Sequence, residues 1–466
     1  MSETQTSGLL DRAWERVVQG LRQATRAEVK PDLPRSDVAR LREQIDACLA
    51  GRGGEVSARR EAVALGGTYL ALNTEGRQRF LRLLASDYGL DRKRLDAAMD
   101  AVSAAGEDEQ ARLSAERRLR AALTAPRLDL LTRFNGLPQG VKFLVDLRSD
   151  LLKIRKESPQ LADLDADLKG LLASWFDVGL LTMQQITWDS PAALLEKLIA
   201  YEAVHEIRSW SDLKNRLASD RRCFAFFHPN MPDEPLIFVE VALVNGIAGN
   251  VHDLLDEDAP VVEPEQADTA IFYSISNAQD GLAGVSFGNF LIKMVAGQLQ
   301  RDLPNLKTFA TLSPIPGFRT WLDKAMQNGG VPKLNPAEAV RLCELAGIGE
   351  PHAALRTLLA RTDWVEDREL ADGMEPILMR LAAHYLAREK RGQGALDRVA
   401  GFHLGNGARL ERLNWGGDVT ANGLRQSAGM MVNYLYRLSE VEKNHEAYAG
   451  SGRIAMSTSV RRLLRD

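Results

Sequence analysis

Cysteine is scarce in this chain of 466 residues, which contains only Cys48, Cys223 and Cys343. The three residues lie far apart, are odd in number and form no C-x-x-C spacing. A disulfide framework and a cysteine-based metal or redox motif are therefore both excluded. We expect a reduced, cytoplasmic setting for a chain with this use of cysteine.

Long hydrophobic runs are also absent. No stretch of about 18 uninterrupted apolar residues occurs, and Met1 is followed by the polar stretch SETQTSG rather than by the apolar core of a signal peptide. The last residues, RRLLRD, do not form a Ser-Lys-Leu peroxisomal address. We therefore expect no membrane partner and no export signal.

An excess of basic charge is a third absence. The chain has 59 Lys and Arg residues against 63 Asp and Glu, a net charge of −4. Nucleic-acid-binding proteins concentrate basic charge on one face, so we expect no nucleic-acid partner. Hydrophobic residues make up 45% and charged residues 26%, which is typical of a globular enzyme. A chain of this length is expected to fold as two or three domains.

The first part of the chain, residues 8–180, has helical spacing and few strand signals. An apolar set from Val38 to Leu49 repeats at helical intervals, and Gly51 follows where the helix is predicted to end. We predict an all-α helical bundle over residues 1–185, which joins subunits or covers the site. The composition changes over Leu181–Pro191, where we expect a linker.

The second part, residues 186–466, mixes strand and helix signals, and we predict an α/β catalytic domain there. A β-hairpin is predicted with arms Cys223–Phe227 and Leu236–Val244. Glu240 lies inside its second arm, where strand alternation leaves open whether its side chain faces solvent or the site. Helices are predicted over Leu194–Tyr201, Trp210–Leu217, Pro336–Leu345, His352–Ala360, Pro376–Lys390 and Leu424–Glu442.

A unit of strand, loop, helix and strand occupies Thr269–Phe318. The strands are predicted over Ala270–Ile275 and Thr308–Leu312, and the turn Ser-Pro-Ile-Pro-Gly follows the second. The helix between them has an apolar face that carries Leu291, Met294, Val295 and Leu299. Such units place ligand chemistry at the carboxyl ends of their strands.

The loop of this unit contains Gly281, Gly284 and Gly288. Glycine lets a backbone approach closely, and the start of a helix has free N–H groups that suit a pyrophosphate. The spacing matches neither G-x-G-x-x-G nor a P-loop, so a plain turn stays open as the alternative. The same loop reads G-V-S-F-G around Ser286, a nucleophile-elbow pattern, but polar and small residues separate it from the strand.

Two further residues are candidates for chemistry. Ser313 precedes a double-proline turn. The serine either simply initiates this turn, or the stiff prolines hold its hydroxyl group rigidly for catalysis. His403 is flanked by glycine and asparagine residues that predict tight turns rather than a helix. An imidazole titrates near neutrality and suits proton transfer, while a structural loop histidine is the alternative. His205 and His445 are each followed by Glu, but neither completes H-E-x-x-H, so no metal site is predicted.

The segments SISNAQDGLAGVSFGNFLIK, LSPIPGF, FHLGNGARLERLNW and MMVNYLYRL together resemble the malonyl-CoA decarboxylase family. The resemblance is strong over the second half of the chain, and it covers the helical part by architecture only. It implies a catalytic half similar to the acyl-CoA N-acetyltransferase fold. It also implies a homo-oligomer, a dimer or tetramer, that uses no cofactor: no metal, biotin or pyridoxal phosphate. The physiological role, malonate breakdown or control of malonyl-CoA, stays open.

The resemblance also implies site residues. The coenzyme A loop falls on Ala283, Gly284, Val285, Ser286, Phe287, Gly288 and Asn289. The acetyltransferase pattern has Gln or Arg at the position of Ala283 and Gly at that of Ser286, so only a backbone role is carried over. Family members can carry a glutamate where this chain has Ser286, and that role is not carried over either.

The family's catalytic serine and histidine fall on Ser313 and His403, which also contact malonyl-CoA in this prediction. A tyrosine of the late helix falls on Tyr436, and Asn406 is a candidate donor to the reacting oxygen. Loss of CO2 from malonyl-CoA leaves charge on the thioester oxygen, so the site needs hydrogen-bond donors there and an acid at the carbon. Other classes stay open: an acyl-CoA-dependent N-acyltransferase, a thioesterase using Ser286, and a non-enzymatic acyl-CoA-binding scaffold.

Overall fold

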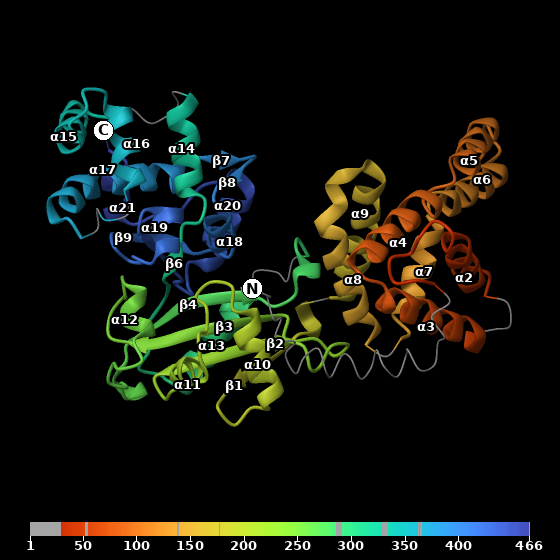
Figure 1. Ribbon diagram of the computed structural model, residues 1–466, viewed down its shortest axis with the longest axis horizontal. Helices are drawn as coiled ribbons and strands as arrows, with labels where there is room; N and C mark the ends of the chain where they lie inside the picture. Colours follow the sequence, from red (N-terminus) through yellow and green to blue (C-terminus); the bar gives the residue numbers. More distant parts are fainter. Residues whose placement is uncertain are drawn as a thin grey trace.

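The computed structural model describes residues 29–51, 55–137, 139–176, 178–285, 291–328, 334–361, 363 and 366–465. Three groups of elements are visible in Figure 1: helices of the first part on one side, a sheet with its own helices, and a mainly helical C-terminal group. None of the described helices is both long and apolar enough to cross a membrane.

The first part is helical, as predicted. Apart from two short 3-10 turns, η1 Arg155–Glu157 and η2 Val178–Leu180, its described elements are α2 Val38–Ala50, α3 Glu55–Ala71, α4 Thr74–Asp87, α5 Arg92–Ala104, α6 Glu109–Ala122, α7 Pro126–Phe134, α8 Gly140–Ile154 and α9 Pro159–Trp175. Helix α8 is buried along much of its length. Its Phe143 packs edge-on against Tyr69 of α3 and Phe134 of α7, with ring centroids 5.6 and 5.0 Å apart.

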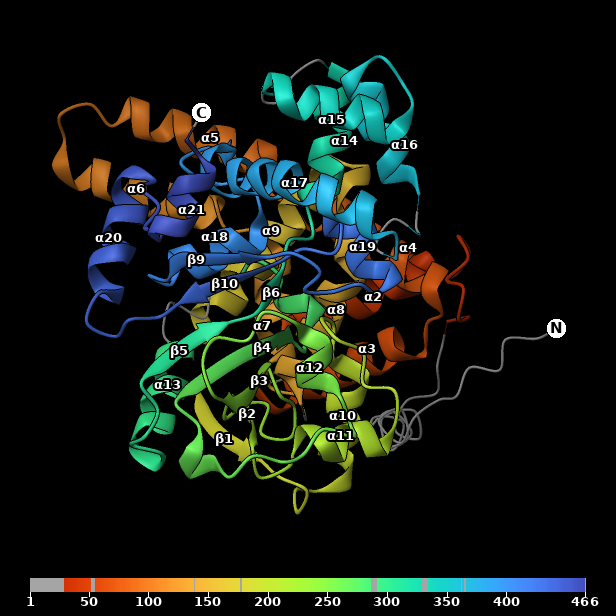
Figure 2. The ribbon, with the colours of Figure 1, turned by 90° about the vertical axis from the view of Figure 1, so that its left-hand side faces the viewer.

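The second part is built on an eight-stranded sheet in the order β1-β2-β3-β4-β5-β10-β6, with β9 paired to β10. Figure 2 shows this succession from β1 at the bottom towards β9 at the top. The strands are β1 Thr182–Ile186, β2 Arg221–Phe227, β3 Ile237–Val244, β4 Thr269–Asn277, β5 Thr308–Thr311, β6 Ser313–Pro314, β9 Arg409–Asn414 and β10 Met431–Leu435. A separate small sheet pairs β7 Lys390–Arg391 with β8 Gly394–Ala395.

The predicted hairpin and its helices are confirmed, but the predicted linker is wrong. Strands β2 and β3 pair antiparallel, and helices α10 Ala192–Tyr201 and α11 Trp210–Arg216 precede them. Residues 181–191, where a linker is expected, instead contain β1, which pairs with β2 along its whole length. A short strand at a sheet edge needs few apolar residues, so its composition resembles that of a linker. The predicted domain boundary at residue 185 falls inside this strand and stays a prediction.

The sheet is covered on both faces because its strands alternate. Cys223, Ala225 and Phe238 share a cluster with residues of α10 and α11. The intervening Phe224 and Val239 belong to the main core, together with residues of α13, Leu291–Asp302. Alternate strand side chains point to opposite faces, so α13 lies on the face opposite α10 and α11.

The two strands and the helix of the predicted central unit are confirmed, and α13 lies between the parallel strands β4 and β5 in the chain. Their pairing runs from Thr269 opposite Thr308 to Phe272 opposite Thr311. Beyond this point β4 pairs only with β3, whereas the chain after β5 pairs as β6 with β10. The two strands therefore take different partners at the position of Ser313.

The rest of the chain returns to helices. They are α12 Val251–Leu255 and, after the central unit, α14 Phe318–Asn328, α15 Pro336–Ala346, α16 Pro351–Ala360, α17 Arg368–Arg388, α18 Arg398–Gly405, α19 Ala421–Ser427, α20 Val441–Ser451 and α21 Thr458–Leu463; the 3-10 turns are η3 Pro264–Gln266 and η4 Asp280–Leu282. The helix predicted over Leu424–Glu442 is wrong. Ala428 and Gly429 both have positive φ and end α19, and β10 follows. Every residue of β10 is buried, and such a short apolar run has no periodicity that separates strand from helix.

A buried arginine joins the helical part to the central unit. Arg148 of α8 is 1% exposed, and its Nη1 donates to the carbonyl oxygens of Gly281 at 2.6 Å and Ala283 at 2.9 Å. Its Nε donates to Asp165 Oδ1 at 2.8 Å, so the buried charge is paired. A Cβ at Gly281 would lie 1.8 Å from the carbonyl oxygen of Val145, so the two backbones touch here.

We expect Gly281→Ala to separate η4 from α8 and to lower the thermal unfolding midpoint, because the new methyl group has no room. The cost is about 1–3 kcal/mol. Gly170→Ala on α9 is the matched control, since a Cβ there meets nothing within 4 Å and alanine favours a helix by up to about 1 kcal/mol. Equal midpoints for the two variants would contradict this account of the junction.

Candidate active site

Ser313 stands near the end of the central unit and is separated from β5 by Leu312 alone. In β6 it pairs with Val432 of β10, and its Oγ donates to Thr311 Oγ1 at 2.9 Å. Pro314 and Pro316 follow, and each fixes its own φ, so the turn that carries the hydroxyl is stiff. The sequence places Thr311 and Ser313 two residues apart, and strand alternation puts both side chains on one side.

His403 lies on α18, and the expectation of tight turns around it is wrong. Gly401 lies within the helix and Gly405 is its last residue, so these glycines do not mark a turn. Gly407, with φ of +80°, is the residue that adopts the left-handed conformation. His403 therefore projects from the last turn of a regular helix into the core.

The two predicted catalytic residues meet, although 90 positions separate them in sequence. Ser313 Oγ and His403 Nε2 are 3.1 Å apart, within hydrogen-bond distance. The other ring nitrogen, Nδ1, lies 2.9 Å from the hydroxyl of Tyr436. Ser313, His403 and Tyr436 are 5%, 3% and 2% exposed. They form a hydrogen-bonded chain that is closed off from solvent.

The donors in this chain follow from the contact with Thr311. Because the single hydroxyl hydrogen of Ser313 points to Thr311 Oγ1, its oxygen accepts from Nε2–H of His403. A neutral imidazole carries one N–H, so Nδ1 then accepts from the Tyr436 hydroxyl. Thr311 Oγ1 also accepts from the backbone N–H of Tyr434 at 3.2 Å. Each member of the chain is oriented by the next.

Burial controls the charge state of these groups. Desolvation lowers the pKa of His403 to about 3, so the imidazole is neutral at neutral pH. Burial likewise raises the pKa of Tyr436 well above its usual range and keeps the phenol protonated. The hydrogen-bonded chain of Ser313, His403 and Tyr436 is therefore uncharged and closed off from solvent.

Tyr434 and Tyr436 differ in role although both lie next to His403. Tyr436 follows β10 rather than lying on a helix, which corrects the expectation for this tyrosine. Tyr434 stacks on the imidazole, with ring centroids 4.6 Å apart and planes at 24°. Sequence reasoning missed Thr311 and Tyr434, yet each stands two residues before a predicted site residue. That spacing along a strand was the available signal.

Asn406 follows α18, three residues after His403, and is bonded within its own helix end. Its Nδ2 donates to the carbonyl oxygen of Phe402 at 2.7 Å, and the residue is 5% exposed. The amide has one further N–H. A role of this group towards a substrate oxygen stays a prediction.

Only part of the predicted coenzyme A loop lies within the described residues. Ala283, Gly284 and Val285 are described, whereas Ser286, Phe287, Gly288 and Asn289 lie outside, and with them the elbow-like pattern around Ser286. Gly284 has φ of +75°, and a Cβ there would lie 3.4 Å from Nζ of Lys169 of α9. No hydrogen bond among the described residues joins Ala283–Val285 to Ser313 or His403.

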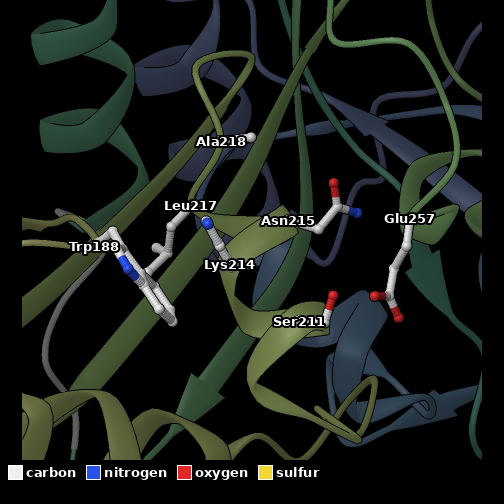
Figure 3. A pocket seen from close by; sticks show the side chains of 7 residues that line it. All are labelled: Trp188, Ser211, Lys214, Asn215, Leu217, Ala218 and Glu257. Atoms are coloured by element: carbon white, nitrogen blue, oxygen red, sulfur yellow. The ribbon is translucent and has the colours of Figure 1, made fainter.

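Two other polar places lie apart from this chain. Glu240 is 1% exposed, its Oε2 lies 3.1 Å from Arg216 Nη1, and desolvation raises its pKa to about 8, so it does not face solvent. A surface pocket of about 350 Å³ is lined by Trp188, Ser211, Lys214, Asn215, Leu217, Ala218 and Glu257 (Figure 3). Neither place contains a residue of the Ser313–His403 chain.

Comparisons with known proteins agree along the chain. Residues 179–466 match the model of the malonyl-CoA decarboxylase C-terminal domain, and residues 88–176 match that of the N-terminal domain of the same family. A goose protein named mitochondrial malonyl-CoA decarboxylase (Anser anser anser) is 40% identical over 82% of this chain and 79% of its own length. A rat protein of the same name (Rattus norvegicus) is 37% identical over 82% and 81%.

Solved structures agree with the sequence comparisons. A malonyl-CoA decarboxylase from Rhodopseudomonas palustris superposes with a TM-score of 0.83 at 42% identity, covering 91% of this chain and 99% of that one. One from Agrobacterium vitis gives a TM-score of 0.81 at 42% identity, covering 92% and 100%. These matches span both the helical part and the mixed α/β part. The chain therefore belongs to the malonyl-CoA decarboxylase family.

Proposed function

We propose that this carboxy-lyase converts malonyl-CoA to acetyl-CoA and CO2, with Ser313 and His403 handling the proton. The observation that carries the proposal is the buried contact of 3.1 Å between Ser313 Oγ and His403 Nε2. It lies where β4 and the chain after β5 take different partners, at the carboxyl ends of two parallel strands. Ligand chemistry is usual at such positions.

The reaction does not need a cofactor to accept the electron pair, because the thioester of the substrate accepts it. The bond between the α-carbon and the carboxylate breaks, CO2 leaves, and the electron pair becomes an enolate on the thioester. The protein has to stabilise the enolate oxygen with hydrogen-bond donors and to protonate the α-carbon. A dry site favours the departure of a carboxylate as neutral CO2, and the burial of Ser313 and His403 supports this part of the proposal.

The proton has a balanced route in this arrangement. The entering malonyl carboxylate favours the imidazolium form of His403, so the imidazole takes up a proton from solvent. After CO2 leaves, Nε2–H supplies the proton to the α-carbon through the Ser313 hydroxyl. The imidazole is then neutral with its proton on Nδ1, next to the Tyr436 oxygen. It regains the resting Nε2–H form by exchanging this proton with solvent as the products leave. One proton is consumed for each CO2 released.

The coenzyme A end of the substrate is assigned to the loop Ala283–Asn289. Two observations support the assignment within its described part: the left-handed Gly284 and the Lys169 ammonium beside it. An ammonium group attracts phosphates as a point charge. Because Lys169 belongs to α9, the helical part also contributes charge to the substrate loop in this proposal.

A homo-oligomer, either a dimer or a tetramer, remains a proposal from the resemblance, and so does a cytoplasmic location. The animal relatives carry the word mitochondrial in their names. Sedimentation of the purified protein measures the first point.

We expect Ser313→Ala and His403→Ala to keep malonyl-CoA binding and to lower kcat by about 10²–10⁴-fold, the usual contribution of a positioned acid or base. Tyr436→Phe removes one hydrogen bond to the imidazole and is expected to cost about tenfold. His352→Ala on the surface of α16 is the control and leaves kcat unchanged. The assay incubates protein with malonyl-CoA alone and follows the products.

Each product pattern decides between reaction classes. Acetyl-CoA with CO2 supports decarboxylation, free coenzyme A with malonate indicates hydrolysis, and turnover only after an amine is added indicates acyl transfer. Binding without any turnover indicates a scaffold. Near wild-type CO2 release by both Ser313→Ala and His403→Ala would remove these residues from the mechanism.

The charge state of His403 is open to measurement. Since its folded pKa is about 3 and its unfolded pKa is about 6.5, the unfolded chain binds more protons at pH 5. Because of His403, the free energy of unfolding therefore falls by about 1.4 kcal/mol per pH unit as the pH falls below 6.5.

In protein labelled at the histidine ring carbons, we expect the His403 NMR signal, assigned by its loss in His403→Gln, to keep its neutral position from pH 7.5 to 5. An unreactive malonyl thioester analogue is expected to move the signal towards the imidazolium position. A midpoint near 6.5 in the free protein would contradict the desolvated site.

A further inference from the structure

A buried carboxylate stands between the two elements that carry the proposed catalytic pair. Asp397 precedes α18 and is 1% exposed. No basic side chain pairs with it among the ion pairs of the described residues. Burial raises the pKa of its carboxyl group, while hydrogen bonds from Ala400, Gly317, Tyr385 and Val399 act in the opposite direction. Burying a carboxylate without a paired cation costs free energy, and among the described residues only hydrogen bonds offset that cost for Asp397.

The two oxygens of Asp397 face different elements. Oδ1 accepts from the backbone N–H groups of Val399 and Ala400, both at 2.9 Å, which caps the helix that carries His403. Oδ2 accepts from the backbone N–H of Gly317 at 3.4 Å and from the hydroxyl of Tyr385 at 3.2 Å. A carboxylate offers about four lone-pair positions, and four donors occupy them here.

The second set of bonds reaches the turn that carries Ser313. Gly317 ends the Ser-Pro-Ile-Pro-Gly turn, and a Cβ there would lie 2.2 Å from the Tyr385 oxygen, so the turn touches α17 directly. Tyr385 also packs against Phe318 and Trp321 of α14, with ring centroids 5.9 and 5.2 Å away. Asp397 therefore joins the ends of α14, α17 and α18 at one point.

An ordinary helix cap makes only half of these bonds. Asp108 before α6 uses one oxygen to accept from the N–H groups of Gln110 and Ala111, at 3.0 and 3.1 Å, and is exposed to solvent. Asp397 makes the same cap and adds the link to Gly317 and Tyr385. The additional bonds contribute nothing to α18 itself, so capping alone does not account for them.

We propose that Asp397 is a positioning residue, which sets the distance between the Ser313 turn and the His403 helix. This inference rests on the proposed function of the Ser313–His403 pair. Proton transfer between such groups needs heavy-atom distances of about 2.6–3.2 Å, and a displacement of about 1 Å costs on the order of 100-fold in rate. Both members of the pair sit on backbone elements that end at this carboxylate.

Asp397→Asn separates the two functions of the residue. Asparagine caps a helix as well as aspartate does, so the amide oxygen keeps the bonds to Val399 and Ala400. The NH2 group in the other position cannot accept from Gly317 N–H or from the Tyr385 hydroxyl. We expect kcat to fall on the order of 10–100-fold while KM for malonyl-CoA stays within about threefold.

Two further variants keep the test interpretable. Tyr385→Phe removes one of the two donors to Oδ2 of Asp397 and keeps the ring packing. It therefore tests the same link even where Asp397→Asn fails to fold, and we expect its kcat to fall about three- to tenfold. Asp108→Asn makes the same chemical change at a helix cap remote from the site and is expected to change neither kcat nor KM.

The deciding measurement compares the effect of Asp397→Asn on kcat in the wild-type protein with its effect in the His403→Ala variant. If Asp397 acts through the imidazole, the substitution lowers kcat in the otherwise wild-type protein but hardly at all in His403→Ala. An equal loss in both backgrounds indicates a merely structural residue and overturns the proposal. A kcat for Asp397→Asn equal to that of Asp108→Asn also overturns the positioning role of Asp397. That result leaves the proposed function of the Ser313–His403 pair intact. Near wild-type activity of His403→Ala alone overturns the proposed function instead.

Discussion

The site depends on keeping an imidazole dry. Water around His403 would restore an ordinary pKa and would compete for the Ser313 hydroxyl, so the surrounding core has to exclude it. The stacked ring of Tyr434, the hydroxyl of Tyr436 and Thr311 at the end of the inner strand β5 together form that enclosure. Because a neutral, desolvated imidazole responds strongly to a nearby negative charge, the same enclosure couples substrate entry to protonation in the proposed reaction.

The helical part and the sheet-containing part are joined by the hydrogen bonds of one buried arginine, Arg148. Arg148 reaches out of the helical core to two carbonyl groups of the central unit and is balanced by Asp165 behind it. Arg155 also contacts Asp165, at 2.7 Å. A buried guanidinium left without these acceptors would be costly, so the two parts stabilise each other. The helices are therefore more than a cover over the sheet.

The sequence predicted the strand, helix and strand of the central unit because their patterns are local: two β-rich runs, a helical apolar face and a double-proline turn. It also assigned Ser313 and His403 to the proposed site, but through resemblance to a family rather than through geometry. Residues 424–442 were mispredicted because β10 is buried throughout, which removes the alternation that marks a strand. The partners Asp397 and Tyr385 have no signal in sequence, since only tertiary packing brings Gly317 against them. Glu240 was undecidable for the same reason, because its partner Arg216 comes from a preceding helix.

The pairing of β6 with β10 has a consequence for how the chain reaches its native state. Ser313 and Val432 are sheet neighbours, yet helices α14 to α19 and strand β9 lie between them in sequence. Bringing the ends of so long a segment together lowers the conformational entropy of the chain before the contact between them stabilises it. Contacts between residues far apart in sequence therefore slow folding. The intervening helices consist of local contacts and form faster. In a chain emerging from the ribosome, Ser313 is thus made early but gains its sheet partner Val432 only after the whole intervening segment has been synthesised.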